Sequence, residues 1–95
     1  MKPEISDLLK SQRQRIDQID RELVKLINSR AEVSREIGEI KHKFKMPIYV
    51  GSREQEVLDA VVTANKGLLA DEDMVDIFRA IMKSSRNAQA RLHDS

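Results

Sequence analysis

A repeating pattern of apolar residues between positions 5 and 44 constrains this chain more than any other feature. Apolar side chains recur at steps of three and four residues, and one step of seven passes over Arg30. This spacing is the heptad repeat of helices that pack side by side. The residues of this seam are Ile16, Ile19, Leu23, Leu26, Val33, Ile37, Ile40 and Phe44. No proline interrupts the stretch, so the pattern predicts one long helix over about residues 5–44.

A helix of this length is too long for one small domain. About 40 residues at 1.5 Å each span about 60 Å. A compact chain of this size should have a radius of gyration of only about 12 Å. The far end of the helix must therefore pack against another copy of the chain. We predict an obligate oligomer, most simply a twofold homodimer.

Local residues indicate where this first helix begins and ends. It should begin between Pro3 and Ser6, because proline suits a first helical turn and serine suits a cap. Its end is expected before Met46, because Pro47 disfavours the α conformation in the residue that precedes it. A loop should follow.

Two shorter helices are expected after this loop. Residues 52–55, Ser-Arg-Glu-Gln, have the pattern of a capping box that opens a second helix over about 53–66. Gly67 is a natural C-terminal stop for that helix. Asp71 can cap a third helix over about 72–92, whose first turn is acidic, as the helix dipole prefers.

Composition fits a single all-α domain over residues 1–95. Apolar residues make up 40% of the chain and aromatic residues only 3%, as expected for helices with aliphatic seams. The net charge is +1 with both signs interleaved, so no basic stripe predicts nucleic-acid binding. The chain has no cysteine, which excludes disulfides and cysteine metal sites. Since no apolar run suits a membrane span or a signal peptide, we expect a cytoplasmic protein without membrane contact.

Two cations on the first helix suggest a binding site for an anion. Arg30 occupies a seam position where leucine would be expected, and a buried guanidinium needs an anionic partner. Lys41 follows eleven residues later, so it returns to within roughly 20° of the same helix face, with Ile37 between the two cations. An anion with an apolar body would fit there. Alternatively, Arg30 pairs with a carboxylate such as Asp20 of a partner helix, and Lys41 is a solvated helix end.

Three further residues are unusual for their positions in the predicted helices. Gly38 lies inside the first helix, where glycine often marks close approach of a ligand or another helix, although a tolerated surface glycine is the alternative. Ser85 and Gln89 stand one turn apart at the apolar stripe of the third helix, so they need polar partners. Those partners could belong to a ligand, or the two residues could form an interhelical hydrogen-bond pair.

The chemistry available to these residues is narrow. The sequence has no nucleophile–base constellation, no glycine-rich phosphate loop and no metal-ligand spacing, so we expect neither a cofactor nor a metal. The polar residues that remain are rich in fixed positive charge and hydrogen-bond donors, and they are Arg13, Arg30, Lys41, Arg53, Glu54, Ser85 and Gln89. Such a set suits a reaction that needs electrostatic positioning without proton transfer or covalent steps.

The order and spacing of these residues resemble the all-helical chorismate mutases. The resemblance covers nearly the whole chain and is strongest to mutase domains at the N-terminus of bifunctional mutase–prephenate dehydratases. The residues that carry it are Arg13-x-x-Ile16-Asp17-x-Ile19-Asp20-x-x-Leu23-x-x-Leu26-Ile27-x-x-Arg30, Ile37-Gly38-x-x-Lys41, Arg53-Glu54 and Ser85-x-x-x-Gln89. The family implies an intertwined dimer of three-helix chains with two equivalent sites. Its activity is the Claisen rearrangement of chorismate to prephenate, in phenylalanine and tyrosine biosynthesis.

The resemblance also implies a role for each polar residue. Arg30 and Arg13 would hold the two substrate carboxylates, with Ser85 assisting. Lys41 and Gln89 would donate to the ether oxygen, which gains negative charge as its bond to carbon breaks. Arg13 lies seventeen residues before Arg30, about 25 Å along the helix and roughly 100° around it, so one chain cannot direct both at one small dianion. The family supplies Arg13 from the partner chain.

The remaining roles concern the ring of the substrate. By resemblance, Glu54 would accept from the ring hydroxyl and Arg53 would add positive potential, whereas both could instead be ordinary first-turn residues. The residues that would line the ring are Ile37, Ile81 and Met82. Val50 stands where the family often has an aspartate that contacts the hydroxyl. Arg86 replaces a residue that is often apolar, and it could either extend outward or add a third cation.

Two other functions remain compatible with this sequence. Isochorismate–pyruvate lyase shares the fold and the use of two arginines. A non-catalytic helical dimerisation or regulatory module is the alternative from another class. Burial of Arg30 and Gln89 argues against a pure coiled coil, because such a module has no need for either residue.

Overall fold

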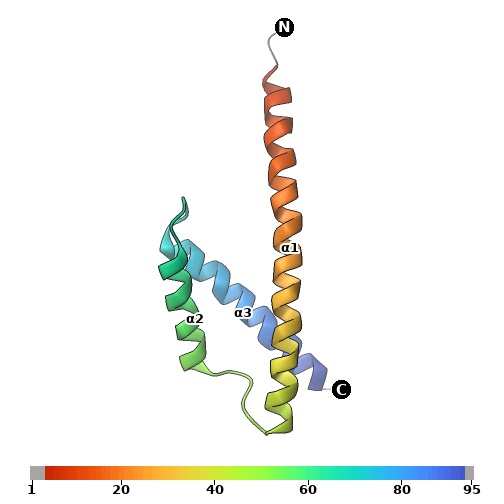
Figure 1. The fold of residues 1–95 in the computed structure, drawn as a ribbon, viewed down its shortest axis with the longest axis vertical. Helices are drawn as coiled ribbons and strands as arrows, with labels where there is room; N and C mark the ends of the chain where they lie inside the picture. The colour runs from red at the N-terminus through yellow and green to blue at the C-terminus, as the bar shows by residue number, and fades with distance from the viewer. Residues whose placement is uncertain (1–3, 94–95) are drawn as a thin grey trace. The chain divides into compact units, whose positions relative to one another are not determined.

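The computed structural model describes residues 4–93, which form three helices joined by two loops (Figure 1). The helices are α1 (Ile5–Lys43), α2 (Gly51–Ala64) and α3 (Asp71–His93). The described part of the chain contains no strand, so the predicted all-α class is confirmed. None of its helices is long and apolar enough to cross a lipid bilayer. The helix α1 begins at Ile5, within the predicted interval from Pro3 to Ser6, although Pro3 itself lies outside the described residues.

The chain divides into two compact units, Met1–Arg30 and Ala31–Ser95. Over its described residues, the first unit is the N-terminal part of α1. It leaves large apolar side chains exposed, among them Ile5 at 76% and Leu26 at 67%. A lone helix is only marginally stable in water, because its stability in proteins comes mainly from packing. This unit therefore needs a covering surface.

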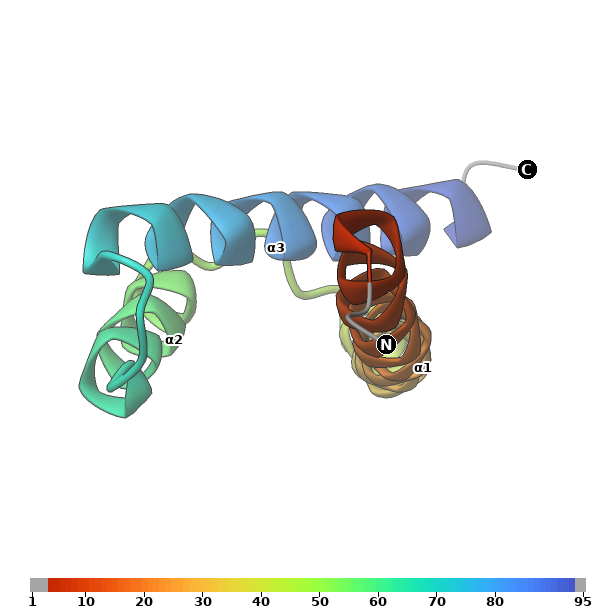
Figure 2. The same ribbon diagram turned by 90° about the horizontal axis from the view of Figure 1, so that it is seen from above.

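The second unit packs α2 and α3 together with the C-terminal part of α1. Within this unit, α3 lies beside α2 and crosses the C-terminal part of α1 (Figure 1 and Figure 2). The buried apolar side chains are Leu58 of α2 and Met82 of α3, which are 7% and 4% exposed. Ser85 and Gln89 of α3 are buried as well. Polar groups thus share the interior of this unit with a small apolar core.

The end of α1 is closed by a turn through a left-handed residue. Lys45 has a φ of 56°, a conformation that usually belongs to glycine. The N–H of Met46 donates to the Lys41 carbonyl at 2.7 Å, and the N–H of Lys45 donates to the His42 carbonyl at 3.2 Å. These two bonds form a Schellman motif, which satisfies helix carbonyls that would otherwise lack partners. The helix therefore ends at Lys43, close to the predicted position, and Pro47 follows.

Replacing Lys45 by glycine should stabilise the protein. A side chain in the left-handed region costs about 1 kcal/mol relative to glycine, so Lys45→Gly should raise the free energy of unfolding by about that amount. Urea unfolding measures the change. Lys43→Gly is the matched control, because Lys43 is helical and glycine there should lower stability. A lower stability for Lys45→Gly would contradict the motif.

The expected capping box at the start of α2 is wrong. The helix begins at Gly51, and Val50 is the cap residue, without a side-chain hydrogen bond. Ser52 therefore lies inside the first turn and does not cap it. Gln55, whose side chain would have reached back to Ser52 in a capping box, instead donates from its Nε2 to Asp59 Oδ1 at 2.9 Å, one turn further along α2.

The predicted stop at Gly67 and cap at Asp71 are also wrong. The helix α2 ends at Ala64, and no glycine among the described residues has a positive φ. The turn is held by Asn65, whose Nδ2 donates to the Leu69 carbonyl at 3.0 Å and to Asp71 Oδ1 at 2.8 Å. Because α3 begins at Asp71 itself, this carboxylate lies in the first helical turn and accepts from the preceding loop.

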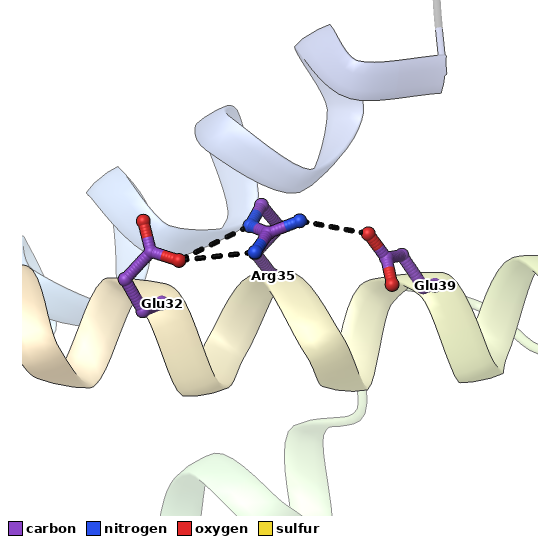
Figure 3. Close-up of polar contacts among 3 residues, drawn as sticks. All are labelled: Glu32, Arg35 and Glu39. Carbon is purple, nitrogen blue, oxygen red and sulfur yellow. Dashed lines mark hydrogen bonds and ion pairs between the residues drawn. The ribbon is translucent and has the colours of Figure 1, made fainter.

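An ion ladder marks an exposed side of α1 in the second unit (Figure 3). Arg35 lies between two carboxylates and donates to Glu32 Oε2 at 3.1 and 3.3 Å and to Glu39 Oε1 at 2.9 Å. The hydrogen bond to Glu32, together with the charges of Glu32 and Glu39, raises the pKa of Arg35. Exposed pairs of this kind stabilise a helix only weakly. Glu32, Arg35 and Glu39 thus pair with one another and are not part of the site described below.

Candidate active site

The buried amide of Gln89 joins α3 to α1. Gln89 is 5% exposed, and its Nε2 donates to the Ser34 carbonyl at 2.8 Å and to Ser34 Oγ at 2.7 Å. Gln89 was expected to need a polar partner, and the structure identifies that partner as Ser34. The sequence pattern had not pointed to Ser34. A signal was available, because Ser34 is four residues after Arg30 and seven before Lys41, on the same side of the helix.

The other amide atom of Gln89 is a buried oxygen with an unused acceptor site. Oε1 has no hydrogen-bond partner among the described residues. A buried oxygen left this way costs about 1–3 kcal/mol, so native proteins rarely keep one without a functional reason. Gln89 thus has a fixed side, held by Ser34, and a side with unused hydrogen-bonding capacity.

The close approach predicted at Gly38 is confirmed. Gly38 is buried, and a Cβ at this position would lie 2.9 Å from Cγ of Gln89 and 3.3 Å from its Cδ. Only a residue without a side chain allows α3 to bring Gln89 this close to α1. The glycine therefore sets the position of the amide.

A methyl group at position 38 should disturb this contact. Gly38→Ala should lower the free energy of unfolding by about 1–2 kcal/mol, because overpacking outweighs the gain in helix propensity of about 1 kcal/mol. Urea unfolding tests this. Gly67→Ala is the matched control, since a Cβ there meets nothing within 4 Å, and it should leave stability unchanged or slightly raised. Equal effects from both variants would refute the tight contact.

Lys41 and Ser85 each donate a hydrogen bond to a backbone carbonyl close to them in the sequence. The Nζ of half-buried Lys41 donates to the Ile48 carbonyl at 2.8 Å, in the loop between α1 and α2. The hydroxyl of Ser85 donates to the Ile81 carbonyl at 3.1 Å, one turn earlier on α3. Lys41 therefore binds the loop that leads into α2. It is not a fully solvated residue at a helix end, which was the alternative.

Glu54 and Arg86 form an ion pair between α2 and α3. Their side chains are 23% and 30% exposed, and Arg86 NH1 donates to Glu54 Oε2. The Arg86 guanidinium also lies over the Tyr49 ring, 5.3 Å from its centroid. Arg86 thus extends toward α2, and Tyr49 is a contributor that the sequence analysis did not identify. Arg53 is exposed and pairs with Glu56 at 3.3 Å, as an ordinary first-turn residue would.

A hollow of about 420 Å³ adjoins this ion pair. Its lining combines cationic side chains of α3 with Glu54 and apolar groups, and comprises Tyr49, Gly51, Glu54, Gln55, Leu58, Arg79, Ala80, Lys83 and Arg86. Within residues 4–93, no group of three or more carboxylates and histidines could hold a metal ion. The hollow gives solvent access to one side of the ion pair.

The other predicted site residues differ in burial. Met82 is buried and Ile81 is half-buried, whereas Ile37 is 44% exposed. Val50, the cap residue of α2, is half-buried. In the first unit, Arg13 is exposed and Arg30 is half-buried, and the site described above is built from the second unit alone. The remaining site residues are Lys41, Glu54, Ser85 and Gln89, which come from the three helices of the second unit.

Comparison with known proteins supports one family. A bifunctional chorismate mutase/prephenate dehydratase of Aquifex aeolicus is 36% identical over 88 residues, which is 88% of this chain but 24% of that protein. The chorismate mutase of Methanocaldococcus jannaschii is 30% identical over 78 residues, covering 81% of this chain and 79% of that protein. This chain thus spans about a quarter of the bifunctional relative and most of the archaeal one.

A solved structure and a family model agree with these relatives. The crystal structure of chorismate mutase from Helicobacter pylori in complex with prephenate superposes with a TM-score of 0.84 at 32% identity. It covers 93% of this chain and 97% of that one. Residues 12–90 match the model of the family described as Chorismate mutase type II. This chain therefore belongs to the type II chorismate mutase family.

Proposed function

We propose that this chain catalyses the Claisen rearrangement of chorismate to prephenate, in the cytoplasm and as part of phenylalanine and tyrosine biosynthesis. The observation that carries the proposal is the buried amide of Gln89, fixed between Gly38 and Ser34. A neutral donor held in a low-dielectric site stabilises developing negative charge without a proton transfer. A unimolecular rearrangement with a developing charge on its ether oxygen needs such a group.

The ether oxygen takes its hydrogen bonds from Lys41 and Gln89. Both hydrogens of the Gln89 amide are directed at Ser34, so binding must free one of them. Turning the amide over moves Nε2 to the side that Oε1 now occupies, and Ser34 Oγ can then donate to Oε1 instead of accepting. The turn gives up the hydrogen bond to the Ser34 carbonyl, and the new bond from Nε2 to the ether oxygen must offset that loss. Lys41 adds a full positive charge.

The two substrate carboxylates are held by arginines. Arg30 binds one carboxylate and Arg13 of a second chain binds the other, with Ser85 assisting. Support comes from helix geometry, since seventeen residues separate the two arginines by about 25 Å along one helix. Arginine presents two parallel N–H donors to a carboxylate, which fixes orientation as well as charge.

The ring of the substrate is recognised by α2 and α3. Glu54 accepts from the ring hydroxyl, Arg53 contributes positive potential, and Val50 borders the hydroxyl without a polar side chain. The apolar residues that line the ring are Ile37, Ile81 and Met82. Support comes from the half-buried carboxylate of Glu54 and from the burial of Met82.

A second copy of the chain covers the seam. All eight seam residues are between 44% and 67% exposed in the single chain. Monomeric proteins rarely leave an apolar surface of this extent in water. A self-complementary twofold pairing of the seam covers it and supplies Arg13 to the neighbouring site. The active form in this proposal is an intertwined homodimer.

A two-substrate assay tests the proposal. The purified chain should convert chorismate to prephenate and should release no pyruvate from isochorismate. Release of pyruvate as the faster reaction would identify a lyase. A folded dimer that binds neither substrate, nor a bicyclic dicarboxylate analogue of the transition state, would identify a non-catalytic module.

A further inference from the structure

We propose that Arg86 is a positioning residue that orients Glu54 for recognition of the substrate hydroxyl. The inference rests on the proposed function, because it concerns how that same site reads its substrate. It follows from the ion pair that links Arg86 of α3 to Glu54 of α2 across 32 positions of sequence. Neither the heptad seam nor the local pattern of α2 requires this contact.

The carboxylate of Glu54 has one oxygen held and one oxygen left for a ligand. Arg86 NH1 donates to Oε2, and the ionised group can accept further hydrogen bonds at Oε1. A glutamate on an exposed first turn would normally sample many rotamers. Pairing with a guanidinium that is itself only 30% exposed restricts Glu54 to one of them. Arg86 therefore determines where the free oxygen lies.

Tyr49 holds the other side of Arg86. The guanidinium lies over the Tyr49 ring, 5.3 Å from its centroid, in a cation–π arrangement. The Tyr49 hydroxyl in turn lies 3.2 Å from the position that a Cβ of Gly51 would occupy. A side chain at position 51 would push against the ring, so Gly51 allows the stack to form. Three consecutive contacts, from Gly51 through Tyr49 and Arg86 to Glu54, thus fix the carboxylate.

The charge of Arg86 also makes Glu54 compatible with an anionic substrate. An unpaired carboxylate would repel a dianion, whereas the Glu54–Arg86 pair has no net charge. Neutralisation alone would not discriminate between substrates that differ only in the hydroxyl. Orientation would, because a misplaced carboxylate loses its hydrogen bond to that hydroxyl. The two contributions can therefore be separated by comparing substrates.

The experiment compares chorismate with an analogue in which hydrogen replaces the ring hydroxyl. For each variant, the measured quantity is the ratio of kcat/KM for chorismate to kcat/KM for the analogue. Loss of folded protein and general electrostatic effects cancel in this ratio. The variants are Arg86→Met, which keeps the apolar stem, Arg86→Lys, which keeps the charge, and Tyr49→Leu, which removes the stack.

Arg79→Met is the matched control. Arg79 lies on α3 two turns before Arg86 and lines the same hollow, but its guanidinium pairs with Asp76 at 4.0 Å. The wild-type chain and Arg79→Met should both prefer chorismate by at least about tenfold. Arg86→Met should lose most of that preference, and Arg86→Lys and Tyr49→Leu should lose part of it. In a Glu54→Gln background, Arg86→Met should change the ratio by less than about threefold.

Two results would overturn the inference but not the proposed function. One is a preference that is unchanged in Arg86→Met, which would make the ion pair merely structural. The other is a wild-type chain that rearranges both substrates equally well, because Glu54 would then not read the hydroxyl. A wild-type chain that rearranges neither substrate would overturn the proposed function as well, so the wild-type assay alone distinguishes the two failures.

Discussion

Co-refolding the Arg13→Ala and Arg30→Ala chains should restore about a quarter of the wild-type activity, although each variant alone is nearly inactive. Each substitution leaves one substrate carboxylate without its bidentate partner and should lower kcat/KM by at least about a hundredfold. Random pairing at equal concentrations makes about half of the dimers mixed. In a mixed dimer, one site combines the intact Arg30 of one chain with the intact Arg13 of the other. The second site carries both lesions.

The measurement is the initial rate of chorismate consumption after joint denaturation and refolding. Joint refolding is needed because an intertwined dimer should exchange its chains slowly. The matched control is a mixture of the two variants after separate refolding, which should stay inactive while size exclusion shows dimers in both samples. Activity after joint refolding that equals this control would rule out a site shared between chains.

Replacing Gln89 by glutamate should make activity strongly dependent on pH. The wild-type amide does not titrate, so turnover should be nearly flat from mildly acidic to mildly alkaline conditions. A protonated carboxyl at position 89 can still donate to the ether oxygen, whereas an ionised one can only accept. At pH 8 the variant should therefore lose at least about a hundredfold in kcat/KM, and it should recover toward acid. Full activity at pH 8 would exclude Gln89 as the donor.

The stability of this variant should change with pH in the same direction. An ionised carboxylate at position 89 would be buried and would face the Ser34 carbonyl, now 2.8 Å from the amide nitrogen. Burial and the nearby oxygen disfavour the charged form, so the pKa of the introduced carboxyl rises in the folded state above about 4.3. The variant is thus most stable below that value, and its stability falls as pH rises toward the folded-state pKa. Urea unfolding at pH 5 and 8 measures the loss, with Gln14→Glu on exposed α1 as the control.

Local sequence patterns predicted the helices and one part of the site. The heptad seam placed α1 to within one residue of its observed end at Lys43, because backbone periodicity depends on near neighbours. Gly38 was identified as a close-approach position, because glycine inside a helix is otherwise unfavourable. The caps were less predictable. Val50 is the cap of α2 in place of Ser52, and Gln55, which a capping box would have used, bonds to Asp59 instead.

The sequence by itself determined the helical class, the apolar seam along α1, and the residue pattern shared with the family. Only the tertiary structure decided which polar groups meet. Gln89 contacts Ser34 across 55 positions, and Arg86 contacts Glu54 across 32, and no local period reports such pairs. The physical reason is that helix propensity and amphipathic spacing act over a few residues, whereas the partner of a buried amide or guanidinium depends on how α3 packs against its neighbours.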